Sequence, residues 1–123
     1  MSSRRFKEGI KPMDKASEAI LALQPVTFRY KKDFDPTGTA QFGLVAEDVG
    51  EVNPDLVVRD KEGKPYSVRY DQVNAMLLNE FLKEHATVQE LKQEIADLKV
   101  GLQKVSARLE LSKFAPQTVV NNQ

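Results

Sequence analysis

Cysteine is absent from this chain of 123 residues, and His85 is its single histidine. Without thiols the protein can form neither disulfides nor thiolate metal sites, and one histidine argues against a histidine-based metal site. We therefore expect no bound metal and no cofactor. His85 lies in the last third of the chain, where we expect it at a helix surface or contact.

An excess of charge of one sign and a long apolar run are also lacking. The 18 basic and 18 acidic residues balance, so no net charge attracts nucleic acid or an anionic membrane. The longest uncharged apolar runs are about five residues, as at 19–23, and are far too short to span a bilayer. No apolar stretch follows the basic N-terminus, as a signal peptide would require. We expect neither a nucleic-acid partner nor a membrane partner.

The hydrophobic content, 41%, and the aromatic content, 7%, are low for a compact monomer. Much of the apolar content lies in the C-terminal third, so we infer that part of the core forms between chains. In the first 70 residues, short helix and strand patterns alternate, which is typical of an α+β fold. Helices are predicted at about 15–23, with Asp14 as N-cap and Ala16, Ile20 and Leu23 on one face, and at 46–52. Strands are predicted at 26–30 and 41–45, and as a β-hairpin at 56–59 and 66–70.

The last helix is predicted to run from about 72 to 113, with Asp71 as its cap and Pro116 beyond its end. It would be about 60 Å long at roughly 1.5 Å per residue. A domain of this size cannot cover such a helix with its own chain. We therefore divide the chain into an α+β head at 1–70, a helical stalk at 71–114 and a flexible polar tail at 115–123.

Apolar residues in the stalk are spaced alternately three and four apart, which forms a heptad seam. The seam consists of Val88, Leu91, Ile95, Leu98, Leu102, Val105 and Leu109. Sustained heptads favour a coiled coil over an amphipathic helix that lies on its own domain. The residues at the a and d positions do not decide between a dimer and a trimer. Extended backward, the register includes Phe81 and Leu77.

Ser2 and Lys7 form a candidate catalytic pair at the N-terminus. A serine needs a base before its hydroxyl attacks a peptide bond, and a neutral lysine amine can be that base. A separation of five residues would place the two side chains apart on a regular helix or strand. They can meet only through a turn, or from two subunits. The alternative is a solvated basic terminus without chemistry.

Five segments of the chain resemble, in order, the intramolecular chaperone domains at the C-termini of phage endosialidase tailspikes and related tail fibres. Residues 2–12, Ser-Ser-Arg-Arg-Phe-Lys-Glu-Gly-Ile-Lys-Pro, are similar to the family motif Ser-Asp-x-Arg-x-Lys-x-x-Ile. The other segments are Leu-Gln-Pro-Val-Thr-Phe at 23–28, Phe-Gly-Leu-Val-Ala-Glu-Asp-Val at 42–49, Asn-Pro-Asp-Leu-Val at 53–57 and Val-Arg-Tyr-Asp-Gln-Val at 68–73. The resemblance covers about residues 2–100.

This resemblance implies a domain that ends a larger protein, directs its trimerisation and folding, and then cuts itself off. Ser2 would be the nucleophile, Lys7 its general base, and Met1–Ser2 the cleaved bond. The implied fold is a mixed head on a trimeric coiled coil. Ser3 stands where the family usually has aspartate, which leaves open whether Ser2 or Ser3 attacks. With Met1 alone before the motif, this chain holds almost no substrate of its own.

Three functions follow as hypotheses. The first is a self-cleaving serine peptidase and chaperone, a homotrimer that assists an upstream fibre or spike protein. We expect it in the cytoplasm of the producing cell during assembly, with the upstream protein on the virion or cell surface. The second is a non-catalytic coiled-coil oligomerisation module. The third, a DNA-binding dimer of the basic-region type, is disfavoured because the basic residues are not contiguous with the heptads.

Two oppositely charged stretches lie in the predicted head. Residues 1–12 carry four basic side chains against Glu8, whereas 41–60 carry five acidic side chains against Arg59. The acidic residues are Glu47, Asp48, Glu51, Asp55 and Asp60. Either they form a solvated face, or they hold the basic N-terminal segment within or between chains. Within the same stretch, Gly43 interrupts a strand pattern and predicts a bulge or a close backbone contact.

Overall fold

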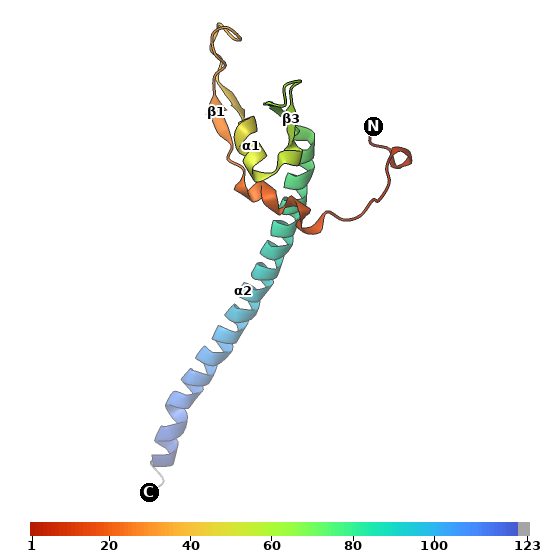
Figure 1. The fold of residues 1–123 in the computed structure, drawn as a ribbon. Coiled ribbons are helices and arrows are strands. Elements are labelled where there is room, and N and C mark those ends of the chain that lie inside the picture. Colours follow the sequence, from red (N-terminus) through yellow and green to blue (C-terminus); the bar gives the residue numbers. More distant parts are fainter. Residues whose placement is uncertain (121–123) are drawn as a thin grey trace. The chain divides into compact units, whose positions relative to one another are not determined.

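The computed structural model describes the backbone of residues 1–120 and the side chains of residues 1–113 (Figure 1). The chain forms two compact units, Met1–Leu82 and Lys83–Gln123. The elements, with η for a 3-10 helix, are η1 (Arg4–Phe6), η2 (Asp14–Ala22), β1 (Val26–Phe28), β2 (Gln41–Gly43), α1 (Ala46–Val52), η3 (Pro54–Leu56), β3 (Val57–Arg59), β4 (Pro65–Val68) and α2 (Tyr70–Val120). Short hairpins and one long C-terminal helix confirm the predicted α+β class.

Both β-hairpins are antiparallel, and each forms its own two-stranded sheet. β1 pairs with β2 so that Val26 lies opposite Gly43, and β3 pairs with β4 so that Val57 lies opposite Val68. A register shift at Val58/Arg59 interrupts the second ladder. The strands are shorter than predicted because side chains, rather than a longer ladder, hold the loops that join them.

Asp35 organises the loop between β1 and β2. Its carboxylate accepts hydrogen bonds from the Thr37 hydroxyl at 2.6 Å and from the Thr39 backbone N–H at 3.0 Å. These bonds, that of Thr37 foremost, lower the pKa of Asp35. Because the pKa is lowered on folding, this contribution to the loop is lost as pH falls through the folded-state pKa.

The core of the first unit lies between α1, the β3–β4 hairpin and the first turns of α2. Among residues 1–113 the buried apolar side chains are Val49, Leu56, Val57, Val68 and Met76. Ile20, Leu23, Leu44 and Val73, all partly buried, pack against them. Five buried side chains make a small core for a unit of this length, so the first unit leaves much apolar surface exposed.

The first predicted helix is a 3-10 helix, and this changes which residues face inward. A 3-10 helix repeats every three residues, so Ser17, Ile20 and Leu23 share one side, with Ser17 fully buried. The predicted face instead contained Ala16, which is exposed. Asp14 is the first residue of η2 rather than its N-cap and has a φ of 49°.

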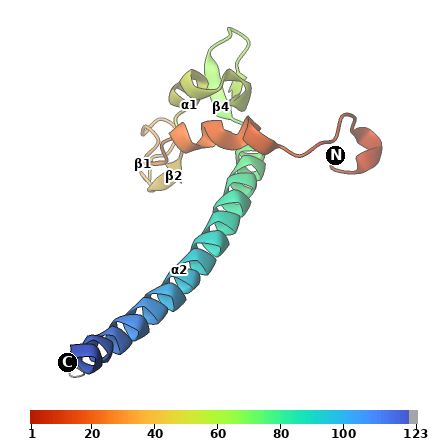
Figure 2. The same ribbon diagram turned by 90° about the horizontal axis from the view of Figure 1, so that it is seen from below.

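Polar contacts tie η2 to the start of α2, and the two helices cross in both views of the ribbon (Figures 1 and 2). The Ser17 hydroxyl donates to Glu80 Oε1 at 2.7 Å. The Asn79 amide donates to Ser17 Oγ at 2.7 Å and to the Asp14 carbonyl at 3.2 Å. A buried serine bonded to a buried carboxylate fixes η2 on this helix, because an unmade bond there would be costly.

α2 begins at Tyr70, so Asp71 lies in its first turn instead of capping it. Its backbone stays helical to Val120, past the expected end at 113 and past Pro116. The residues between 102 and 120 include neither glycine nor asparagine, the residues that most often end a helix. The predicted tail is therefore helical at 115–120, and 121–123 lie outside the described residues. Among the described helices, none is both long and apolar enough to cross a membrane.

Gly43 makes the close contact that the sequence predicted. A Cβ at this position would lie 3.0 Å from the Tyr70 hydroxyl oxygen. That hydroxyl accepts a hydrogen bond from the Leu44 backbone N–H at 3.0 Å and so anchors β2 to α2. We expect Gly43→Ala to displace Tyr70 and to lower the free energy of unfolding by about 1–3 kcal/mol, measured by urea denaturation.

Gly50→Ala is the matched control. Its Cβ would meet Val57 Cγ2 at 3.5 Å, an ordinary contact. Because Gly50 lies within α1, alanine should raise the free energy of unfolding by about 0.5–1 kcal/mol through its higher helix propensity. Equal effects of the two substitutions would contradict the proposed Gly43–Tyr70 contact.

Candidate functional site

A short turn brings the side chains of Ser2 and Lys7 together. The backbone N–H groups of Phe6 and Lys7 donate to the carbonyls of Ser3 and Arg4, each at 3.0 Å, and form η1. The turn reverses the chain, so that Lys7 Nζ donates to Ser2 Oγ at 3.4 Å. A turn is one of the two ways in which this spacing allows a contact, and here it acts within a single chain.

The two serines before the turn have different surroundings. Ser3 is the N-cap of η1, and its hydroxyl oxygen accepts from the Arg5 backbone N–H at 3.4 Å. Ser2 lies one residue earlier, and its hydroxyl oxygen faces the lysine amine. The local geometry therefore gives Ser3 a structural contact and Ser2 a contact with a potential base.

The whole segment at 1–12 is exposed. A lysine amine accepts a proton only in its neutral form, which burial or nearby positive charge favours. Arg4, Arg5 and Lys11 supply positive charge in the same segment, and the Arg5 guanidinium lies 4.5 Å from the centre of the Phe6 ring. In the single chain, charge is thus present but burial is not.

The heptad seam of α2 is exposed along its full length. Its seven side chains have exposed fractions from 41% at Val88 to 72% at Leu98. Apolar side chains at such positions are normally covered by a partner helix. The long helix is therefore compatible with the predicted coiled coil, and Val88, Leu91, Ile95, Leu98, Leu102, Val105 and Leu109 are its candidate contact residues.

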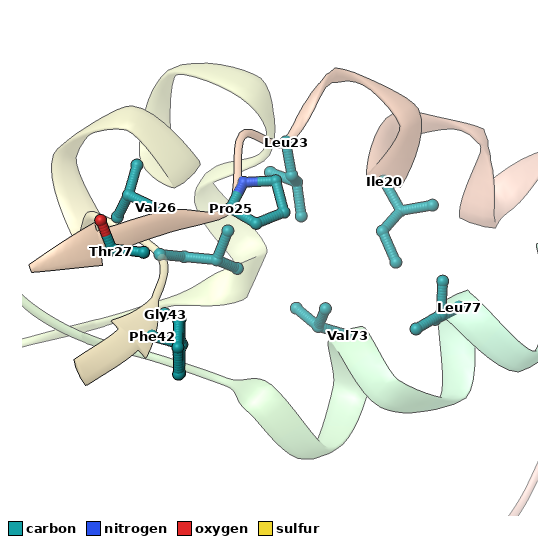
Figure 3. Close-up of a pocket in the computed structure, with 10 residues that line it drawn as sticks. Ile20, Leu23, Pro25, Val26, Thr27, Phe42, Gly43, Val73 and Leu77 are labelled. Carbon is teal, nitrogen blue, oxygen red and sulfur yellow. The ribbon is translucent and has the colours of Figure 1, made fainter. Parts of the chain in front are cut away.

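An apolar groove of about 480 Å³ lies in the first unit, among η2, β1, β2 and the first turns of α2 (Figure 3). It is lined by Ile20, Leu23, Pro25, Val26, Thr27, Phe42, Gly43, Leu44, Val73 and Leu77. Figure 3 shows Ile20 and Leu77 on facing sides, from η2 and α2. The groove could not be predicted from the sequence, because its walls come from segments far apart in the chain.

A more polar pocket of about 270 Å³ adjoins this groove. Leu23 and Leu44 line both hollows, and Asp48 and Glu51 of α1 line the polar pocket. Two of the acidic residues singled out in the sequence therefore line a pocket that shares Leu23 and Leu44 with the apolar groove. This combination of apolar walls and an acidic rim could receive a segment that carries both apolar and basic side chains.

A family model matches the part of the chain that contains this geometry. Residues 2–58 match the model of a peptidase family described as "Chaperone of endosialidase". The match begins at the serine beside Lys7 and continues through both strands of the first hairpin and α1. It is shorter than the resemblance expected over about 2–100. No curated protein matches the chain. The match confirms the predicted resemblance over residues 2–58.

Proposed function

We propose that this domain trimerises, assists the folding of an upstream fibre- or spike-type protein, and then releases itself by cutting the bond before Ser2. The contact of 3.4 Å between Lys7 Nζ and Ser2 Oγ carries the proposal. It lies at the first residues of the segment that matches the family. Both groups therefore stand where a cut would separate the domain from whatever precedes it.

The proposed reaction uses the two side chains in turn. Neutral Lys7 takes the hydroxyl proton of Ser2 as Oγ attacks the carbonyl carbon of residue 1. The peptide C–N bond breaks, the Ser2 amine receives the proton, and the upstream segment is held as an ester on Oγ. Water then hydrolyses this ester, which leaves a carboxylate on the upstream product and restores the hydroxyl.

Trimerisation would serve folding through proximity. Three chains joined along α2 raise the effective concentration of their upstream segments for one another. Cleavage after assembly would make trimerisation irreversible, because the released protein would no longer carry the domain through which its chains could reassemble. We place this step in the cytoplasm of the producing cell.

A second candidate function is oligomerisation without chemistry. It rests on the exposed heptad seam, which by itself could hold chains together. In that case the basic N-terminus would have only a structural role. The two functions differ in one observable property, which is whether a longer precursor is cut.

A fusion of an upstream segment with residues 2–123 tests the proposal. We expect two products, one of which has Ser2 as its N-terminal residue, because the base and the nucleophile meet there. Mass spectrometry and N-terminal sequencing would identify the cut, and ultracentrifugation would give the oligomeric state. An intact fusion in a well-formed trimer would leave only the oligomerisation module.

A further inference from the structure

The N-terminal segment presents apolar side chains to water as well as charge. Phe6 is 51% exposed and Ile10 is 53% exposed, and they lie four residues apart. Arg4, Arg5, Lys7 and Lys11 surround them in the sequence. The segment thus carries two exposed apolar side chains among basic ones.

The groove described above is complementary to such a segment. Its walls are apolar side chains, among them Ile20, Val26 and Leu77. The adjoining pocket is lined in part by Asp48 and Glu51, whose negative charge is opposite to the net charge of residues 1–12. An apolar side chain that leaves water for such a groove gains free energy in proportion to the buried area, and the charges would fix its direction.

The N-terminal segment of a chain runs away from the groove of the same chain. In Figures 1 and 2 the segment before η2 runs away from β1 and β2, which form one wall of the groove. The segment joins the head beside η2 at Pro12, and its N-terminal residues continue outward. A neighbouring chain in an oligomer is therefore the better source for an occupant of this groove.

We propose that residues 4–11 of one copy dock in the apolar groove of a second copy, with Phe6 and Ile10 between its walls and the side chains of Arg4, Arg5 and Lys11 toward Asp48 and Glu51. Docking would remove the Ser2–Lys7 pair from water, and burial favours the neutral amine that can act as a base. Cleavage would then depend on assembly. This consequence rests on the proposed function, whereas the docking itself does not.

Disulfide trapping tests the docking, and the cysteine-free chain provides a clean background. Full-length chains with Ile10→Cys and others with Thr27→Cys, each with its own tag, are mixed and oxidised. Thr27 is exposed and lines the groove. We expect disulfide-linked pairs that carry both tags. Lys61→Cys on the β3–β4 turn is the matched control for Thr27→Cys. It should form few disulfide-linked pairs with Ile10→Cys.

Three results would overturn the docking. One is the absence of cross-linked pairs. Another is equal cross-linking of Ile10→Cys to Thr27→Cys and to Lys61→Cys, which would show random collision. The third is a disulfide formed only within single chains that carry both Ile10→Cys and Thr27→Cys, which would show that the segment occupies the groove of its own head.

Two exposed phenylalanines provide the activity test. Phe42 lines the groove and is 84% exposed, whereas Phe34 lies on the β1–β2 loop outside it and is 80% exposed. In a cleavable fusion, Phe42→Lys should slow cutting about tenfold or more, because the groove loses an apolar wall and gains a repelling charge. Phe34→Lys should be cut at the unaltered rate. Both variants should remain trimeric.

The outcomes separate the two proposals. If the fusion is cut and Phe42→Lys has no effect on the rate, docking does not control cleavage and this inference fails, while the proposed function stands. If no fusion is cut but Ile10→Cys joins to Thr27→Cys between chains, the proposed function fails and the docking stands.

Discussion

Ser2→Ala and Lys7→Ala should each leave a fusion of an upstream segment with this domain uncut. Ser2 Oγ would form the ester, and Lys7 Nζ, 3.4 Å away, would take its proton. Loss of either member of such a pair typically lowers the rate by about a thousandfold or more. Gel analysis of the fusion over several days would measure the residual rate. Ultracentrifugation of the same samples should show unchanged oligomers, because both residues lie far from the heptads in the sequence.

Ser3→Ala and Lys61→Ala are the matched controls. Ser3 caps η1, and loss of such a cap costs about 1 kcal/mol, so cleavage should continue with at most a modest loss. Lys61 is also an exposed lysine, and it lies on the β3–β4 turn, outside both the pair and the docking segment. If Ser3→Ala stopped cleavage and Ser2→Ala did not, the nucleophile would be Ser3.

Much of the head could be predicted from local chemistry. Asp35 and Asp60 accept hydrogen bonds from backbone N–H groups two residues on, and Gly38 and Gly63 have positive φ angles. Such residues specify turns by themselves, so both hairpins were predictable. The short helix α1 has the predicted bounds 46–52. The close approach at Gly43 was also predictable, since a glycine within a strand pattern often marks one.

Features that depend on contacts between distant segments were not predictable. The pattern in 14–23 fits an α-helix as well as a 3-10 helix, and the bond from Ser17 to Glu80, distant in sequence, helps to decide between them. The groove needs η2, β1, β2 and α2 to be in place. For the candidate pair, the residues and the need for a turn were predictable from the sequence. The turn that joins them, η1, is visible only in the structure.

The heptad seam was read from spacing alone, but its role depends on a partner that the single chain does not contain. Within residues 1–113 its side chains are exposed, as they must be before assembly. The same reasoning links the seam to the candidate site. The seam and the candidate site both expose groups to water, although the proposed roles of these groups require burial. In both cases, further copies of the chain could bury them. Assembly is therefore the step on which the proposed chemistry depends.

Leu98→Asp should dissociate the proposed trimer into single chains. Leu98 occupies a d position in the middle of the seam and is 72% exposed in the single chain. In a trimer, each of three leucines would lose about 1.5–3 kcal/mol of burial, and three carboxylates would face one another at the axis. We expect the mass in solution to fall from three chains to one at micromolar concentration, measured by ultracentrifugation. The rate at which a fusion is cleaved should also fall, because neighbouring chains would no longer bury the Ser2–Lys7 pair.

Val100→Asp is the control within the same helix. Val100 is also apolar and exposed, but it lies at an f position, outside the seam, so the trimer and the cleavage rate should survive the same change of charge. If Leu98→Asp left the mass unchanged, the heptads would not join the chains. If it gave single chains that still cut the fusion at the full rate, cleavage would not require assembly, and the Ser2–Lys7 pair would be active within one chain.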